Sequence, residues 1–370
     1  MADTAAGHRR SPIHLLVGAP LPQLLRSIRR HGGISPRYLL QAAALFAIAL
    51  VRLPEIAVEA AMMRKRIASA QRDLAPVIIV GHWRSGTTYL HNLLARDPFF
   101  RTPRMFESAL PYEFAPGPIT TFRRWLLRWL LPATRPMDDV PLADDVAQED
   151  EIALAAMGAP SFFNCFYFPS RLQETFAREV LFEGLSAKEH AQFAGRLRYF
   201  LAKLRAVEPC GRLLLKNPAH SARIPALREM LPRARFIHIR RNPAEVFVST
   251  RRLYRSMLPW LALQDFETVD IEDHVLWAYP RIMDPLLAGL AAFAPGEVIE
   301  VRYEDLIAAP GDTLAMIYTA LGMERPAPPI AESAAMPSRT TVTASDIAKV
   351  NGRWASYFER LGYARPCVET

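Results

Sequence analysis

Cysteine is scarce in this chain. Three cysteines occur among 370 residues, at Cys165, Cys210 and Cys367, and no two of them form a C-x-x-C pair. Widely spaced cysteines in an odd number favour neither a disulfide framework nor a structural zinc site. The sequence therefore predicts a protein of a reducing compartment, and a cytoplasmic location is expected.

A secretory signal and a long apolar run are also missing. The first twelve residues contain basic side chains but no apolar core followed by a small-residue cleavage site. The apolar, uncharged run 38–51 is shorter than the roughly 20 residues that a membrane-spanning helix needs. A helix packed against the main domain is expected there, with docking at a membrane surface as the alternative.

Positive charge is in moderate excess. Lysine and arginine number 45 against 37 acidic residues, which gives a net charge of +8. Such a chain suits a polyanionic nucleotide, an anionic membrane surface or nucleic acid. The arginines are scattered among apolar residues and no RNP, zinc-finger or helix-turn-helix pattern is present, so no nucleic-acid partner is expected.

The segment 76–94 combines a short apolar run, a polar loop with two glycines and a helical pattern. Residues 77–80 (V-I-I-V) fit a central parallel strand, and the leucines beyond the loop recur at helical spacing. The loop therefore lies at a helix N-terminus, where unpaired backbone N–H groups and the helix dipole attract an anion. Gly81 and Gly86 allow the backbone to fold tightly around a phosphate.

The loop G-H-W-R-S-G-T-T departs from the Walker A pattern G-x-x-x-x-G-K-[ST], because Thr87 stands where the lysine belongs. The cation lies inside the loop, as Arg84. This arrangement resembles the 5′-phosphosulfate loop of sulfotransferases, whose donor is 3′-phosphoadenosine 5′-phosphosulfate (PAPS). The resemblance implies that the donor is bound by Arg84, Ser85, Gly86, Thr87 and Thr88.

A second motif, R-R-N-P-A-E-V-F-V-S, follows a predicted strand at 235–239. Its Arg241 and Ser249 stand at the spacing with which sulfotransferases hold the 3′-phosphate of PAPS. An arginine fork supplies two charge-assisted hydrogen bonds to a phosphate, and a serine two turns along the next helix can approach the same anion. The resemblance continues through Y-E-D-L at 303–306 to G-R-W near the end, where Arg353 is the expected further cation.

Further strands are predicted at 213–216 and 298–301, with helices at 186–207 and 224–230. Strands that alternate with helices indicate a mostly parallel sheet with right-handed crossovers. The expected fold is α/β, a P-loop-like three-layer fold with a central, mostly parallel sheet flanked by helices. Residues 1–75 are expected to form an N-terminal helical extension, and 76–370 the sulfotransferase domain.

The resemblance implies transfer of a sulfuryl group from PAPS to a hydroxyl, or an amine, of a small-molecule, lipid or carbohydrate acceptor. By analogy with phosphoryl transfer, the protein positions the two substrates and neutralises developing charge. Arg84 and Lys216 are expected to do this without a metal. Lys216 ends a predicted strand, where ligands of open α/β sheets gather.

Three side chains are candidates for the general base. Glu107 follows Arg101 and Arg104, and enzymes that sulfate protein tyrosines have an arginine-flanked glutamate in a similar place. His220 follows Lys216, and the ordinary pKa of a histidine, about 6.5, suits a base at neutral pH. His91 is directed along the face of the first helix. Glu107 is the favoured candidate.

Two other functions stay open at this point. A P-loop kinase or NTPase would need the missing lysine and a strand-terminal aspartate for Mg²⁺, and a nonenzymatic nucleotide-binding protein would also explain the positive charge. The acidic segment 138–151 could hold a metal, but its like charges favour a solvated helix face. The helix predicted at 120–132 combines tryptophans with arginines, and with 38–51 it predicts a surface for peripheral membrane association.

Overall fold

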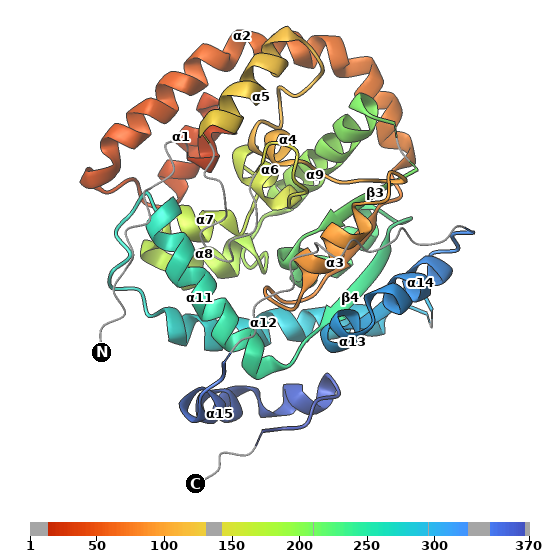
Figure 1. The fold of residues 1–370 in the computed structure, drawn as a ribbon. Coiled ribbons are helices and arrows are strands. Elements are labelled where there is room, and N and C mark those ends of the chain that lie inside the picture. Colours follow the sequence, from red (N-terminus) through yellow and green to blue (C-terminus); the bar gives the residue numbers. More distant parts are fainter. Residues whose placement is uncertain (1–13, 131–142, 210, 295, 325–340, 367–370) are drawn as a thin grey trace.

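The computed structural model describes residues 14–130, 143–209, 211–294, 296–324 and 341–366, so Cys210, Cys367 and two residues of the predicted acidic segment, Asp138 and Asp139, lie outside it (Figure 1). Within these ranges one sheet forms, in the order β2-β3-β1-β4-β5 and with every neighbouring pair parallel. Its strands are β1 (Val77–Val80), β2 (Phe100–Arg101), β3 (Arg212–Lys216), β4 (Arg235–Arg240) and β5 (Val298–Arg302). The four predicted strands are confirmed to within a residue at each end, and the short β2 was not predicted.

The segments that follow β1, β3 and β4 lie together at the carboxyl ends of the strands. All four residues of β1 are buried, which is why a continuous β-branched run forms the central strand. In the parallel register Ile79 lies opposite both Lys216 of β3 and Ile237 of β4. The chain that follows each of these three strands therefore emerges at the same, carboxyl edge of the sheet.

Helices pack on both faces of the sheet, which confirms the three-layer α/β fold (Figure 1). Val77 and Ile79 face a cluster with the leucines of α3 and the apolar residues of α13 and α14. Ile78 and Val80 belong to the larger core on the other face. The helices are α1 (Leu21–Arg30), α2 (Leu39–Ala70), α3 (Thr87–Leu94), α4 (Met105–Ala109), α5 (Pro118–Leu130), α6 (Asp150–Ala156), α7 (Phe163–Tyr167), α8 (Leu172–Glu179), α9 (Ala187–Val207), α10 (Ile224–Met230), α11 (Pro243–Leu261), α12 (Ile271–Ala291), α13 (Tyr303–Ala308), α14 (Pro310–Ala320) and α15 (Ala344–Arg360), with short 3-10 turns that include η5 (Pro218–Arg223).

The N-terminal segment is helical, as predicted, but α2 is much longer than the predicted 38–51. It runs for 32 residues and includes Pro54. A proline removes one backbone hydrogen bond of its helix, and here that loss falls on the exposed side of α2. Leu16 and Leu45 share one core cluster with Ile78 of the sheet, so the segment packs onto the rest of the chain.

Candidate active site

The loop between β1 and α3 has a conformation that requires its two glycines. Gly81 and Gly86 have φ angles of +146° and +99°. A Cβ on Gly86 would lie 2.3 Å from the ring of Tyr303, and one on Gly81 would lie 2.3 Å from the carbonyl oxygen of Ile239. Ser221 fixes the loop entrance, since its hydroxyl accepts the Gly81 N–H at 2.9 Å and donates to the Gly81 carbonyl at 3.1 Å.

The remaining loop residues lead the chain into α3. The hydroxyl of Ser85 donates to the carbonyl of His82 at 2.8 Å, which closes the turn. Gly86 is the N-cap of α3 and offers no side chain to the first N–H groups, and Thr87 and Thr88 form the first turn. A helix N-terminus without a side-chain cap is suited to hold an anion through its backbone.

The two sequence motifs meet at this loop. Arg84 donates from Nε to the hydroxyl of Ser249 on α11 at 2.9 Å, across 165 residues of sequence. Arg241 donates from Nη1 to the carbonyl of Arg84 at 3.2 Å and stacks over the ring of Tyr303 at 4.1 Å. Tyr303 therefore supports both the loop, at Gly86, and the arginine of the second motif.

Lys216 lies buried at the carboxyl end of β3, and it forms an ion pair with Glu149. Glu149 is the N-cap residue of α6, and its side chain is 17% exposed. The sequence analysis placed Glu149 in an acidic segment and gave it no catalytic role. Its position directly before two further acidic residues at a helix start is a capping signal that could have marked it.

The expectation of a solvated acidic face is wrong for Asp150 and Glu151, because both side chains are fully buried. Asp150 accepts a hydrogen bond from His220 at 2.9 Å, and Glu151 pairs with Arg223 at 3.0 Å. Both partners, His220 and Arg223, come from η5, which follows Lys216 in the chain. Among the described residues, no group of three or more His, Cys, Asp or Glu side chains is arranged to hold a metal ion.

The three predicted base candidates are all enclosed. Glu107 uses one carboxylate oxygen for an ion pair with Arg101 and the other to accept the Arg104 N–H at 2.8 Å, which caps α4. His220 is fully buried against Asp150. His91 is also fully buried, and burial, followed by the nearby charge of Lys216, lowers its pKa to about 3.

Arg353 is not brought to the two motifs. It lies on the exposed side of α15 and forms an ion pair with Asp273 of α12 at 3.0 Å. The reason is the neighbouring Trp354, whose fully buried indole donates to the Leu276 carbonyl at 3.0 Å and so turns Arg353 outward. Figure 1 shows α15 below α12 and well apart from α3.

Comparison with known proteins shows the family of this chain. Residues 76–327 match the model of the sulfotransferase family, which is more than half of the chain. The chain belongs to the sulfotransferase family. It is 30% identical, over 82% of its length and 79% of theirs, to the omega-hydroxy-beta-dihydromenaquinone-9 sulfotransferases Stf3 of Mycobacterium bovis and Mycobacterium tuberculosis.

Solved sulfotransferases share the fold. STF9 from Mycobacterium avium superposes with a TM-score of 0.61 at 18% identity, covering 96% of this chain and 99% of that one. STF1 from Mycobacterium tuberculosis H37Rv also gives 0.61, at 20% identity and with 91% of both chains covered. The match confirms the predicted P-loop-like fold of this sulfotransferase.

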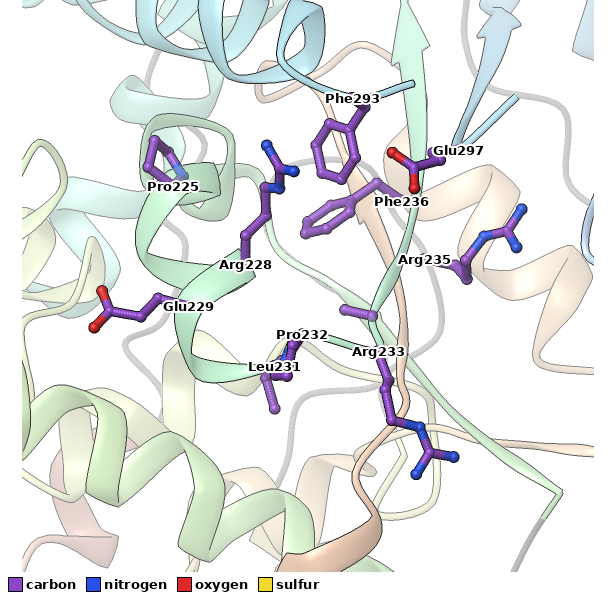
Figure 2. A pocket seen from close by; sticks show the side chains of 11 residues that line it. Pro225, Arg228, Glu229, Leu231, Pro232, Arg233, Arg235, Phe236, Phe293 and Glu297 are labelled. Atoms are coloured by element: carbon purple, nitrogen blue, oxygen red, sulfur yellow. The ribbon is translucent and has the colours of Figure 1, made fainter. Parts of the chain in front are cut away.

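A pocket of about 600 Å³ opens away from this site (Figure 2). Arg233, Arg235 and Phe236 line it at the start of β4, with Phe293 beside Phe236, and Arg228 of α10 lies across from them. Ligands of open α/β sheets bind at the carboxyl ends of the strands, whereas this pocket lies at an amino end. Its volume therefore does not mark the site predicted from the sequence, which is at the loop 81–86.

Proposed function

We propose that this sulfotransferase moves a sulfuryl group from PAPS to a hydroxyl group of a lipid-like acceptor. The supporting observation is the convergence of Arg84, Ser249 and Arg241 at an uncapped helix N-terminus. A nucleotide with phosphates at both the 5′ and the 3′ position needs two anion sites close together. The loop 81–88 is suited to the first phosphate, and Arg241 with Ser249 to the second.

The reaction requires positioning and charge neutralisation. The acceptor oxygen attacks sulfur, a new S–O bond forms, and the S–O bond to the 5′-phosphate breaks as adenosine 3′,5′-bisphosphate (PAP) leaves with its electron pair. The backbone N–H groups of Gly86, Thr87 and Thr88 are proposed to hold the 5′-phosphate. Arg84 and Lys216 are proposed to neutralise the charge that builds on the transferred group.

The hydroxyl proton needs an acceptor, and we propose Glu149 ahead of Glu107 and His220. Both oxygens of Glu107 already accept hydrogen bonds at the start of α4, and His220 is closed off by Asp150. Glu149 is partly exposed and contacts Lys216. A carboxylate in this place lies beside the cation that is proposed to face the sulfuryl group, which is where a base must be.

The acceptor class is proposed from the relatives. The names of the Stf3 proteins of Mycobacterium describe an enzyme that acts on an omega-hydroxylated dihydromenaquinone, a hydroxylated isoprenoid lipid. For this chain we propose an acceptor of the same chemistry, an isoprenoid or similar lipid with a free hydroxyl. We also propose a cytoplasmic enzyme that meets this acceptor at the membrane.

The donor is tested first by calorimetric titration of PAP and of adenosine 5′-phosphate, each with and without a metal chelator. Tighter binding of PAP that the chelator leaves unchanged is the expected result. Equal affinity for the two nucleotides would refute the assignment of the second phosphate site. Activity is then tested with sulfur-labelled PAPS and hydroxylated isoprenoid lipids in detergent, with the corresponding non-hydroxylated lipids as controls, where only the former should take up label.

A further inference from the structure

Between residues 39 and 62, the charged side chains of helix α2 face the protein and many of its large apolar side chains face outward. Its charged side chains in this stretch, Arg52, Glu55 and Glu59, are directed toward the protein. Arg52 is 3% exposed and binds the carboxylate of Glu113 at 2.6 Å. Glu59 pairs with Lys203 of α9 at 2.6 Å. A surface helix of a water-soluble protein has the opposite arrangement, with its apolar stripe inside and its charges outside.

The outer side of the same stretch is apolar. Leu40 is 86% exposed and Val51 is 79% exposed, values that such side chains seldom have in a folded protein. The other large apolar side chains exposed on α2 are Leu39, Ile48, Leu50, Leu53, Val58 and Met62. An 18-residue stretch of this helix has a mean hydropathy of 1.7, and only 22% of the stretch is buried in the protein.

Helix α5 repeats this arrangement beside α2. Arg123 forms ion pairs with Glu55 of α2 and with Glu113, and Arg124 pairs with the buried Asp144. The opposite side of α5 exposes a row of apolar and aromatic residues, Ile119, Phe122, Trp125, Leu126 and Trp129. Figure 1 shows α5 beside α2 at the top of the molecule, and the ion pair of Arg123 with Glu55 joins the two helices; we treat their exposed rows together as the α2–α5 face.

We propose that the α2–α5 face inserts into the surface of an anionic lipid bilayer and holds the enzyme there. Exposed tryptophans on an amphipathic helix suit the boundary between acyl chains and headgroups. Basic residues lie next to the face, at Arg64 and Lys65 after the apolar part of α2 and at Arg128 on α5, where they can meet anionic headgroups. The charges of the bilayer and of this rim are thus complementary.

The helix lies on the membrane and does not cross it. By length and composition alone α2 could cross a bilayer, since its 32 residues extend about 48 Å and a hydrocarbon core is about 30 Å thick. Its inner side is tied to the protein over much of this length, through Arg52 with Glu113 and Glu59 with Lys203. A spanning helix would have to leave these buried ion pairs, so the geometry points to one-sided contact. This inference goes beyond the proposed function and holds for any acceptor.

The test is flotation of the full chain with vesicles of phosphatidylcholine and phosphatidylglycerol in equal parts. The variant Leu40→Glu/Trp129→Glu places two charges in the face, and Met316→Glu, at an exposed apolar residue of α14, is the matched control. The double variant should lower the vesicle-bound fraction by about tenfold or more, and the control should not. Titration of each variant with PAP shows whether the variant is folded. In vesicles with brominated acyl chains, tryptophan fluorescence should be quenched less in Trp129→Phe than in the wild type.

Three results would overturn the proposal. The first is a wild-type chain that stays off these vesicles at low salt. The second is a Leu40→Glu/Trp129→Glu variant that floats as well as the wild type. The third is a dimer that this variant dissociates while the wild type shows no vesicle binding, since a second copy would then cover the face. Vesicle binding is read without PAPS, so it can succeed even if the proposed reaction fails.

Discussion

Removing the guanidinium of Arg241 should weaken PAP far more than adenosine 5′-phosphate. Arg241 is almost buried, stacks on Tyr303 and donates to the carbonyl of Arg84, so its position is fixed before any ligand arrives. In the structure Nε and Nη2 of its fork bind the carboxylate of Glu245, and in the proposed complex the 3′-phosphate takes the place of that carboxylate. A lost hydrogen bond to a charged group is worth about 2 kcal/mol, which is about 30-fold in Kd.

Comparing the two nucleotides separates direct binding from disturbance of the loop. Arg241→Ala also deletes the contact with the Arg84 carbonyl, and this loss acts on both nucleotides because both use the loop. For adenosine 5′-phosphate we therefore expect about threefold at most, and for PAP this loop effect multiplied by the 30-fold or so of the 3′-phosphate contact, about 30- to 90-fold. The ratio of the two changes measures the contact with the 3′-phosphate alone.

Calorimetric titration of the wild type and Arg241→Ala with each nucleotide gives these four affinities. The neighbouring Arg240 provides a matched control, since its guanidinium donates to the carbonyl of Leu361 and not to the loop. Arg240→Ala should leave both affinities within about twofold. If Arg241→Ala weakens the two nucleotides equally, Arg241 supports the loop only, and the proposed site of the 3′-phosphate is wrong.

Three further predictions concern the base, the buried ion pair and the pH dependence of stability. At saturating PAPS, Glu149→Gln should lower turnover by about 10²-fold or more, whereas Glu107→Gln should retain most of the turnover. The reverse result would assign the general base to Glu107. Arg223→Met leaves the buried carboxylate of Glu151 without its cation and should lower the free energy of unfolding by about 3–5 kcal/mol in urea melts, whereas an unchanged midpoint would contradict the pairing. The pKa of His91 falls from 6.5 unfolded to about 3 folded, so its stabilising contribution is complete above pH 6.5 and is lost as pH falls toward 3. Between pH 6 and 5, His91→Met should therefore make the loss of stability shallower by about 1.4 kcal/mol per pH unit, and identical slopes would show that His91 already binds a proton in the native state.

The sheet and the conformation of the loop 81–86 could be predicted because their signals are local. A buried parallel strand must be apolar on both faces, so V-I-I-V at 77–80 fits few other structures. The positive φ angles at Gly81 and Gly86 are conformations that glycine adopts without strain. Arg241 and Ser249 both contact Arg84 of the loop, and their predicted role at the 3′-phosphate stays a prediction.

The acidic segment could not be interpreted from its own residues. Asp150 and Glu151 carry the charges of a solvated helix start, and nothing within the segment indicates burial. Their burial depends on His220 and Arg223, which lie about 70 residues further along the chain and reach them only because η5 follows β3 at the carboxyl edge. A charged side chain is buried only where a partner can pair with it, and the topology of the sheet decides which residues reach that place.

The side of α2 that faces the protein could not be predicted, for a similar reason. Periodicity indicates which residues share a helix face, but it assigns the inner face only when one face is clearly more apolar than the other. Between residues 39 and 62 almost every position is apolar, so the three charged residues would ordinarily be placed outside. Glu113 and Lys203, from two other parts of the chain, draw Arg52 and Glu59 inward and leave the apolar side exposed. An exposed apolar surface that depends on buried ion pairs is costly in water, and contact with lipid would remove that cost. The inward charges and the outward tryptophans are therefore two consequences of one arrangement, and disrupting the ion pairs of α2 should weaken vesicle binding as well as stability.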